Sequence, residues 1–174
     1  LSTSTTPATA VYSNARTAGS FVNQTLTAST CPANLTICVE GQPVRTGSNT
    51  VVNFATNGGW YIDFPGSGER VNTDPTLVLG ILAFTTNVPQ TSSCTSGGYS
   101  YGYFLDYRSG APLTNSTSPT NTIAGVKIGN FIAPRPVLIK LPGETTPWIK
   151  YPNGVIIKPP MPTISQVLRR TSWR

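Results

Sequence analysis

The sequence contains no histidine and few charged residues, and these shortages exclude several kinds of chemistry. Without histidine among its 174 residues, the chain cannot form a histidine-activated nucleophile or a metal site built on imidazole. Its three cysteines are too few for a four-thiolate zinc site. No hydrophobic run approaches the roughly 18 residues that a membrane-spanning helix requires. We therefore expect a chain that does not span a membrane.

Neutral polar residues take the place of charged ones. Charged residues make up 10% of the chain, whereas it has 26 threonines, 16 serines and 12 asparagines. Strong helix formers are scarce, while β-branched and aromatic residues recur throughout the sequence. This composition predicts an all-β, loop-rich domain with antiparallel sheets, and a β-sandwich is one architecture that fits it.

The charges that are present are unevenly placed. Residues 1–126 carry a net charge of −1, and residues 127–174 carry +7. A basic end can bind nucleic acid, but here the basic residues are scattered singly, apart from Arg169-Arg170. We interpret residues 127–174 as a solvated face with a basic end that docks elsewhere, and we expect no nucleic-acid partner.

Two of the cysteines are candidates for a local disulfide. Six residues separate Cys31 from Cys38, in a stretch that contains proline and asparagine, so the two can pair in an oxidising compartment. Cys94 is left over, and it is either a free thiol or bonded to chain outside this sequence.

Short strand-like runs separated by turn residues fill the chain after residue 20. Residues 1–20 are rich in serine, threonine and alanine and predict a linker or poorly ordered start, so that residues 21–174 form the β-rich domain. The nearly continuous apolar run 81–88 indicates a strand that is buried on both faces. Asn153-Gly154 predicts a two-residue hairpin turn. Strands are expected at 21–27, 50–54, 59–64, 69–72, 75–79, 81–88, 99–107, 124–128, 136–140, 148–151 and 155–158.

A series of tyrosines is the main candidate for a binding surface. Tyr99, Tyr101 and Tyr103 lie at alternate positions, and the period of a strand places them on one face. Such a ladder either packs between two layers or lines a surface for a carbohydrate or a protein partner. We take these three residues, with the polar loop 114–122, as candidate exposed contacts. The rings of Trp60 and Trp148 are expected in the core.

No catalytic, metal-binding or cofactor-binding residue is predicted. Asp63 and Glu69 flank an expected turn and are a formal carboxylate pair for acid–base chemistry, but many proteins meet that requirement by chance. We instead expect Glu69 to pair with Arg70 or a neighbouring amide. Neither the acidic pattern of a calcium loop nor the glycine pattern of a dinucleotide-binding loop is present.

Five unlike motifs in a fixed order resemble one known family. They are GGWYIDFPGSGERV (58–71), LAFTTNVP (82–89), Cys94 with Gly97-Gly98, LDYRSG (105–110) and RRTSWR (169–174). FVNQTLT (21–27) and GNFIAPRPVLIKLP (129–142) also lie in the right order. Over residues 21–174 the chain is similar to the C-terminal region of the PilC/PilY family of type IV pilus tip-associated adhesins and assembly factors.

The resemblance implies a bacterial extracellular or cell-surface protein, at the pilus tip or the outer membrane. It implies a role in pilus biogenesis, adhesion to surfaces or host cells and twitching motility, by binding rather than by catalysis. The implied partners are minor pilins, the rest of a longer parent chain and a host or surface receptor. The family's calcium site lies on an upstream propeller loop, so no cofactor is expected in this segment.

The implied fold is part of a modified β-propeller. Propeller blades take about 40–45 residues each, so 174 residues supply at most about four of them. We therefore expect upstream chain to complete the ring, in keeping with a sequence that begins at Leu1. The alternative from a different class is a stand-alone carbohydrate-binding or hydrolytic β-domain. A structural pilin is a third alternative, but residues 1–50 show no helical period.

Overall fold

The structure is a computed structural model, and it describes residues 14–17, 19–90, 97–114, 120–141, 144–150, 154 and 156–157. Within these ranges every regular element is a β-strand, which confirms the expected all-β class. The strands are β1 (Phe21–Asn23), β2 (Leu26–Thr30), β3 (Pro43–Gly47), β4 (Gly59–Tyr61), β5 (Thr76–Val78), β6 (Ile81–Pro89), β7 (Gly98–Asp106), β8 (Ile123–Gly129), β9 (Val137–Leu141), β10 (Glu144–Lys150) and β11 (Ile156–Ile157).

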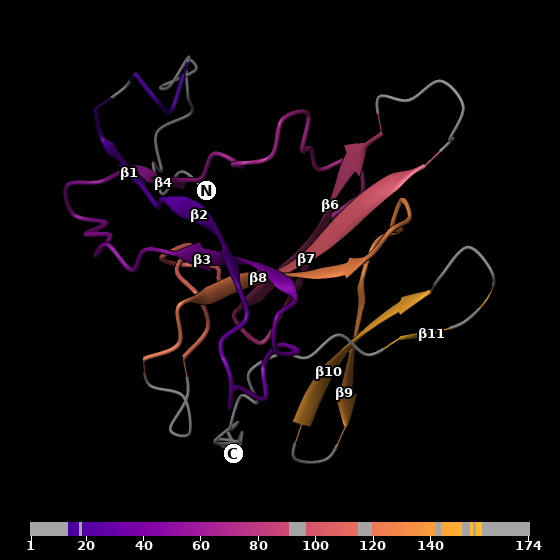
Figure 1. Cartoon of the computed structure of the whole chain (residues 1–174). Coiled ribbons are helices and arrows are strands. Elements are labelled where there is room, and N and C mark those ends of the chain that lie inside the picture. The colour runs from indigo at the N-terminus through magenta and orange to yellow at the C-terminus, as the bar shows by residue number, and fades with distance from the viewer. Residues whose placement is uncertain are drawn as a thin grey trace, which may run out of the picture.

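The strands form one large sheet and two small ones (Figure 1). The large sheet has six antiparallel strands in the order β2-β3-β8-β7-β6-β5, and the β6–β7 pair is its longest ladder. A three-stranded antiparallel sheet has the order β11-β10-β9, and β1 pairs with β4 in parallel. The six-stranded sheet is not closed, so β2 and β5 are its edges.

Both faces of the six-stranded sheet are buried over its central strands. All residues of β6 from Ala83 to Val88 are buried, as the apolar run predicted. Opposite residues of an antiparallel pair share a face, so Phe84 and Thr86 lie with Tyr103 and Tyr101 on one side, which we call the tyrosine face. Residues with Asn87 on the other side form what we call the asparagine face; they include Thr85, Ser100 and Phe104.

Residues 60–69 cross the tyrosine face and cover its aromatic core. Phe84 stacks on Tyr103 with ring centroids 5.0 Å apart, and Phe64 packs on both rings at 6.1 and 5.4 Å. Gly125 lies under Tyr103, where an added Cβ would come within 2.8 Å of the ring, so only glycine fits there. The indole of Trp60 is partly buried and donates a hydrogen bond to the Tyr107 carbonyl at 3.0 Å.

Three chain segments cover the asparagine face. The first is the loop closed by the disulfide between Cys31 and Cys38, whose Cα atoms are 6.0 Å apart and whose side chains are both buried. The second is residues 131–134, which cross the sheet without forming a strand. The third is the small sheet of β9 and β10, which contributes Leu138 and Ile149 to the same core.

The expected strand at 21–27 is divided into β1 and the start of β2, and the expected strand at 50–54 is wrong. Gln24 is fully buried between β1 and β2, and its side-chain oxygen accepts hydrogen bonds from the Thr50 amide and the Ser48 hydroxyl. Its side-chain nitrogen donates to the carbonyls of Thr50 and Ser109 at 2.6 and 2.8 Å. The side chain of Gln24 lies at the break in the first run and binds both the amide and the carbonyl of Thr50, which a strand starting there would use.

Three other local expectations need correction. The strand β3 was not predicted, because Arg45 in its centre is buried although its residue type favours solvent. Residues 69–72 do not return as a hairpin; Arg70 instead forms a single bridge with Asn87. In the β10–β11 hairpin Lys150 pairs with Ile156, whereas a two-residue Asn153-Gly154 turn would pair it with the next residue.

Candidate functional site

The tyrosine ladder is mostly a packing feature. The ring centroid of Tyr101 lies 6.0 Å from that of Tyr99 and 6.4 Å from that of Tyr103, so the three rings lie on one face as expected. The prediction that they are exposed contacts is wrong for Tyr101 and Tyr103, which are 4% and 0% exposed beneath residues 60–69. Tyr99 at the open end is half-buried, with the Lys127 ammonium 5.1 Å from its ring centroid. Only Tyr99 of the three remains accessible to a partner.

A buried carboxylate holds the covering segment to the tyrosine face. One oxygen of Glu69 accepts hydrogen bonds from the Thr86 hydroxyl at 2.8 Å and the Tyr103 hydroxyl at 2.7 Å. Its other oxygen accepts from the Arg45 guanidinium at 3.0 Å and the Gly66 amide at 3.2 Å. Four donors thus satisfy one carboxylate, which accounts for its complete burial.

The charge of this cluster is fixed by its surroundings. Burial is the largest single influence and would lower the pKa of Arg45, but the Glu69 carboxylate and the neighbouring Tyr101 and Tyr103 together raise that pKa. Burial and then the Glu69 charge raise the pKa of the Tyr103 phenol far above its ordinary value. The guanidinium of Arg45 also lies 4.1 Å from the centre of the Tyr101 ring, and its Nε finds no hydrogen-bond partner among the described residues. The cluster is a closed ionic support for the fold.

Asp63 and Glu69 do not form a carboxylate pair. Asp63 instead lies at the surface, where it forms an ion pair with Arg16. The hydrogen bond from Arg16 lowers the pKa of Asp63 below its ordinary value. The formal acid–base pair considered from the sequence is therefore separated into a surface ion pair and a buried cluster.

On the asparagine face a neutral network replaces the ionic one. The Asn87 side-chain oxygen accepts hydrogen bonds from the Ser100 hydroxyl at 2.6 Å and the Ala133 amide at 2.7 Å. Its nitrogen donates to the Asn72 side-chain oxygen at 2.5 Å and the Ala133 carbonyl at 3.1 Å. Nearby, the Thr85 hydroxyl donates to the Pro134 carbonyl at 3.0 Å. The backbone of residues 131–134 is thus held against the sheet at several points.

This attachment turns other side chains of the same segment outward. Ala133 is 1% exposed, whereas its neighbours Ile132 and Pro134 are exposed. Val137 is paired with Trp148, and Lys150 with Ile156, in the ladders of the three-stranded sheet. These four side chains therefore lie on the same face of that sheet. A groove lies between that face and the fixed segment.

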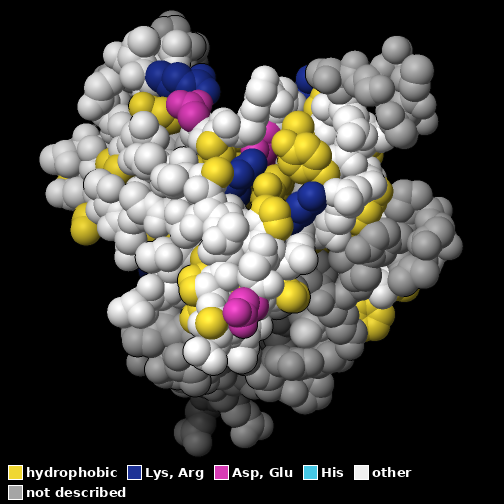
Figure 2. Space-filling model, viewed as in Figure 1, with side chains coloured by type: hydrophobic (Ala, Val, Ile, Leu, Met, Phe, Trp, Pro, Cys, Tyr) yellow, Lys and Arg dark blue, Asp and Glu magenta, His cyan; other side chains and the backbone are white. Residues whose placement is uncertain are grey.

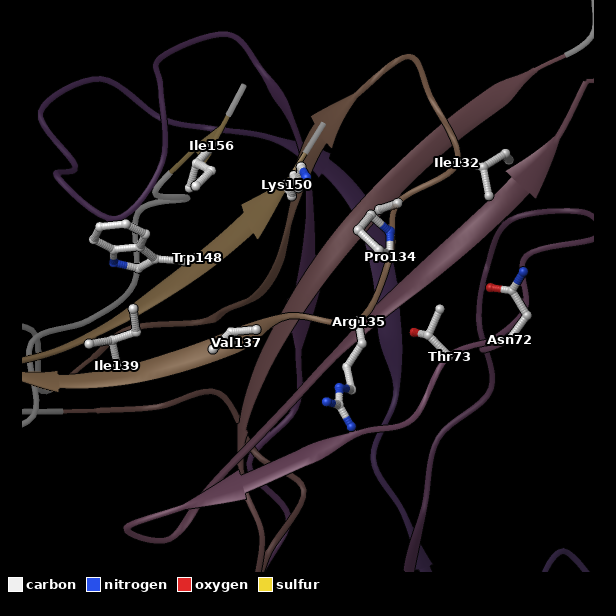
Figure 3. Close-up of a pocket in the computed structure, with 11 residues that line it drawn as sticks. Asn72, Thr73, Ile132, Pro134, Arg135, Val137, Ile139, Trp148, Lys150 and Ile156 are labelled. Carbon is white, nitrogen blue, oxygen red and sulfur yellow. The ribbon is translucent and has the colours of Figure 1, made fainter. Parts of the chain in front are cut away.

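The groove has a cavity volume of about 650 Å³ and a mostly apolar lining (Figure 3). Arg135 from the fixed segment and Lys150 from β10 are its charged residues, and both are exposed. Neither forms an ion pair with any residue that the structure describes. The lining residues are Asn72, Thr73, Ile132, Ala133, Pro134, Arg135, Val137, Ile139, Trp148, Lys150 and Ile156.

Sequence reasoning did not find this groove. Its residues come from the 72–73 turn region, the 132–139 stretch and the β10–β11 hairpin, which no local motif connects. One signal was present: Val137, Leu138 and Ile139 are apolar in succession, so β9 has apolar side chains on both faces. Trp148 was expected in the core, but it is only partly buried and lines the groove.

Several expected features lie outside the described residues, namely Cys94, residues 115–119 of the polar loop and the RRTSWR motif. Among the residues that the structure does describe, no three histidine, cysteine, aspartate or glutamate side chains gather as a metal site would require. The same residues include no helix long and apolar enough to cross a membrane. Comparison with known protein families, with curated proteins and with solved structures finds no match for this chain.

Proposed function

We propose that this chain is the C-terminal part of a type IV pilus tip-associated protein of the PilC/PilY kind. In this proposal it supports pilus biogenesis, adhesion to surfaces or host cells and twitching motility. It acts at the bacterial surface, with minor pilins, the parent chain and a receptor as its partners. The observation that carries the proposal is the order of five unlike motifs along one sequence.

Support for reading these motifs as one set comes from their packing. The 58–71 motif supplies Phe64 and Glu69, which cover the strand formed by the 82–89 motif. At Gly98 an added Cβ would lie 2.2 Å from the Val88 carbonyl oxygen, so the glycine is required where β7 begins. At Gly110, in the LDYRSG motif, an added Cβ would lie 2.4 Å from the Trp60 ring. These motif residues thus pack on one another within one domain.

Two further observations support binding rather than catalysis. The one fully buried carboxylate among the described residues, Glu69, is engaged by four donors and supports the fold. The surface is largely neutral, with few charged side chains on the face in Figure 2. Together with the Cys31–Cys38 disulfide, such a surface suits a protein in an oxidising extracellular environment.

The propeller architecture is part of the proposal. The six-stranded and three-stranded sheets would be blades of a larger, modified propeller, and β2 and β5 would be the edges at which further strands of the parent chain pair. An unpaired edge strand offers backbone donors and acceptors to another strand, which supports this view.

Deletion of the gene for the full-length protein tests the proposal. We expect loss of surface pili, of attachment and of twitching, measured by electron microscopy, adhesion counts and colony spreading. Complementation with the intact gene should restore all three. Normal piliation and adhesion in the deletion strain would contradict the proposal, and saturable glycan binding by the purified chain would favour the carbohydrate-binding alternative.

A further inference from the structure

The three-stranded sheet has apolar side chains on both of its faces. Leu138 and Ile149 on one face pack into the core beneath the asparagine face. On the other face Val137 and Ile156 line the groove and are each 52% exposed. Ile132 on the facing wall is 41% exposed. Apolar side chains that gather on one exposed surface mark an interaction site more often than isolated ones do, so the groove face has the character of a surface that receives a partner.

The charges of the groove indicate which partner. Arg135 and Lys150 lie on different walls of it, and no carboxylate is among the described residues that line it. A complementary occupant is therefore apolar and negatively charged. The chain's own residues 158–174 contain four basic residues and no acidic one, so their charge has the same sign as that of the groove and does not complement it.

The groove needs little rearrangement to receive an extended peptide. The wall that carries Pro134 and Arg135 is fixed in advance by the bonds of Asn87 and Thr85, so little ordering is needed when a ligand enters. An extended peptide directs alternate side chains to opposite sides. If aliphatic and acidic residues alternate, one row packs on the sheet while the other lies towards the cationic rim.

We infer that this groove binds an extended segment of a partner protein in which aliphatic and acidic residues alternate. The inference rests on the proposal that the chain acts by binding, but it does not depend on the assignment to pili. It adds a site and a partner chemistry to that proposal.

Synthetic peptides test the chemistry directly. The probe is a fluorescein-labelled seven-residue peptide in which glutamate and valine alternate, added to the purified 174-residue chain and followed by fluorescence anisotropy. One control peptide has lysine in place of glutamate, and the other has serine in place of valine. We expect both controls to bind about tenfold more weakly or worse, and the affinity of the probe to fall as salt rises.

Charge-reversal variants test the place of binding. The double variant Arg135→Glu/Lys150→Glu should weaken binding of the probe by about tenfold or more. Its matched control is Arg70→Glu/Arg108→Glu, which changes the net charge equally at two exposed sites that do not line the groove. That control should stay within about twofold of the unchanged chain. Thermal unfolding of both variants checks that the fold is retained.

Equal binding of the probe and its lysine counterpart, or equal effects of the two double variants, would overturn the inference. Tighter binding of laurate, of a neutral oligosaccharide or of a peptide with the sequence of residues 158–174 would also overturn it. The two proposals can fail separately. If the deletion strain lacks pili but the purified chain does not bind the probe, the groove assignment alone is refuted. Probe binding with normal piliation in the deletion strain refutes the pilus assignment alone.

Discussion

The two faces of the six-stranded sheet are covered in similar ways but held by different chemistry. On the tyrosine face the buried Glu69 carboxylate binds four donors and pairs with Arg45. On the asparagine face the Asn87 amide makes four hydrogen bonds with no formal charge. In each case one side chain fixes an irregular segment across the sheet. The stability that a buried charge contributes depends on its counter-ion, whereas the stability that a neutral network contributes depends on the number of its hydrogen bonds.

The segments held by Glu69 and by Asn87 also differ in what they cover or line. The segment held by Glu69 covers aromatic core, so its loss should affect stability. The segment held by Asn87 is a wall of the groove, so its loss should affect stability and binding together. Variants of the two faces should separate these effects.

The largest effect is expected from Glu69→Ala, which leaves the Arg45 guanidinium buried without a counter-ion. We expect a loss of about 3–5 kcal/mol in the free energy of unfolding, measured by denaturant titration. Adding Arg45→Met should recover part of the loss, since the unpaired charge is then removed. A cost below about 1 kcal/mol for the single variant would show that the pair is solvated.

A smaller loss of stability is expected from Asn87→Ala. The Ala133 carbonyl then loses the Asn87 donor, and the Ala133 amide keeps only the Ser100 hydroxyl as its acceptor, so the expected cost is about 1–3 kcal/mol. Because the same change loosens the wall of the groove, binding of the acidic peptide should also weaken. Glu69→Gln, compared at a temperature where both variants are folded, should leave that binding unchanged.

Alkaline pH should destabilise the tyrosine face by a similar or smaller amount. The pKa of Tyr103 is raised in the folded chain, mainly by burial, so its contribution is complete below its ordinary pKa of about 10 and declines as the pH rises above it. The expected loss at pH 11 is about 1.4 kcal/mol relative to pH 8 for this group. Tyr103→Phe should flatten the decline, as followed by thermal unfolding between pH 8 and 11. Equal slopes for the two proteins would contradict the prediction.

The smallest effect is expected at the exposed ion pair of Arg16 and Asp63. The pKa of Asp63 is lowered by Arg16, so its contribution is present above its ordinary pKa of 3.8 and is lost as the pH falls below that value. Asp63→Asn should leave the midpoint of thermal unfolding at pH 7 almost unchanged, because the pair is open to solvent. A shift as large as that of Asn87→Ala would contradict the comparison between buried and exposed supports.

Local pattern predicted the centre of the sheet but not its supports. The apolar run in β6 and the alternating tyrosines in β7 are short-range signals, and both strands lie where the sequence placed them. Arg45 and Glu69 are 24 residues apart, so the partner that permits the burial of Arg45 cannot be read from its neighbours. The exposure of the tyrosines was misjudged for the same reason, because the segment that covers them is distant in sequence.

The groove could not be predicted for a related reason. One of its walls is held by hydrogen bonds from Asn87 to Asn72 and to Ala133, which is 46 residues from Asn87. The side chains that line it belong to separate stretches, and none has a residue pattern specific to binding. Composition and period predicted how the strands form, but the site depends on how they are brought together.

The position of Asn87 has a consequence for the order of folding. The Asn87 side-chain amide makes all its hydrogen bonds only when the Asn72 region and residues 131–134 have packed against β6. Contacts between residues distant in sequence form slowly. The groove wall is therefore completed late, after the β6–β7 hairpin that supports it. An immature or partly unfolded copy would not offer the groove, so a partner that binds there would select finished molecules.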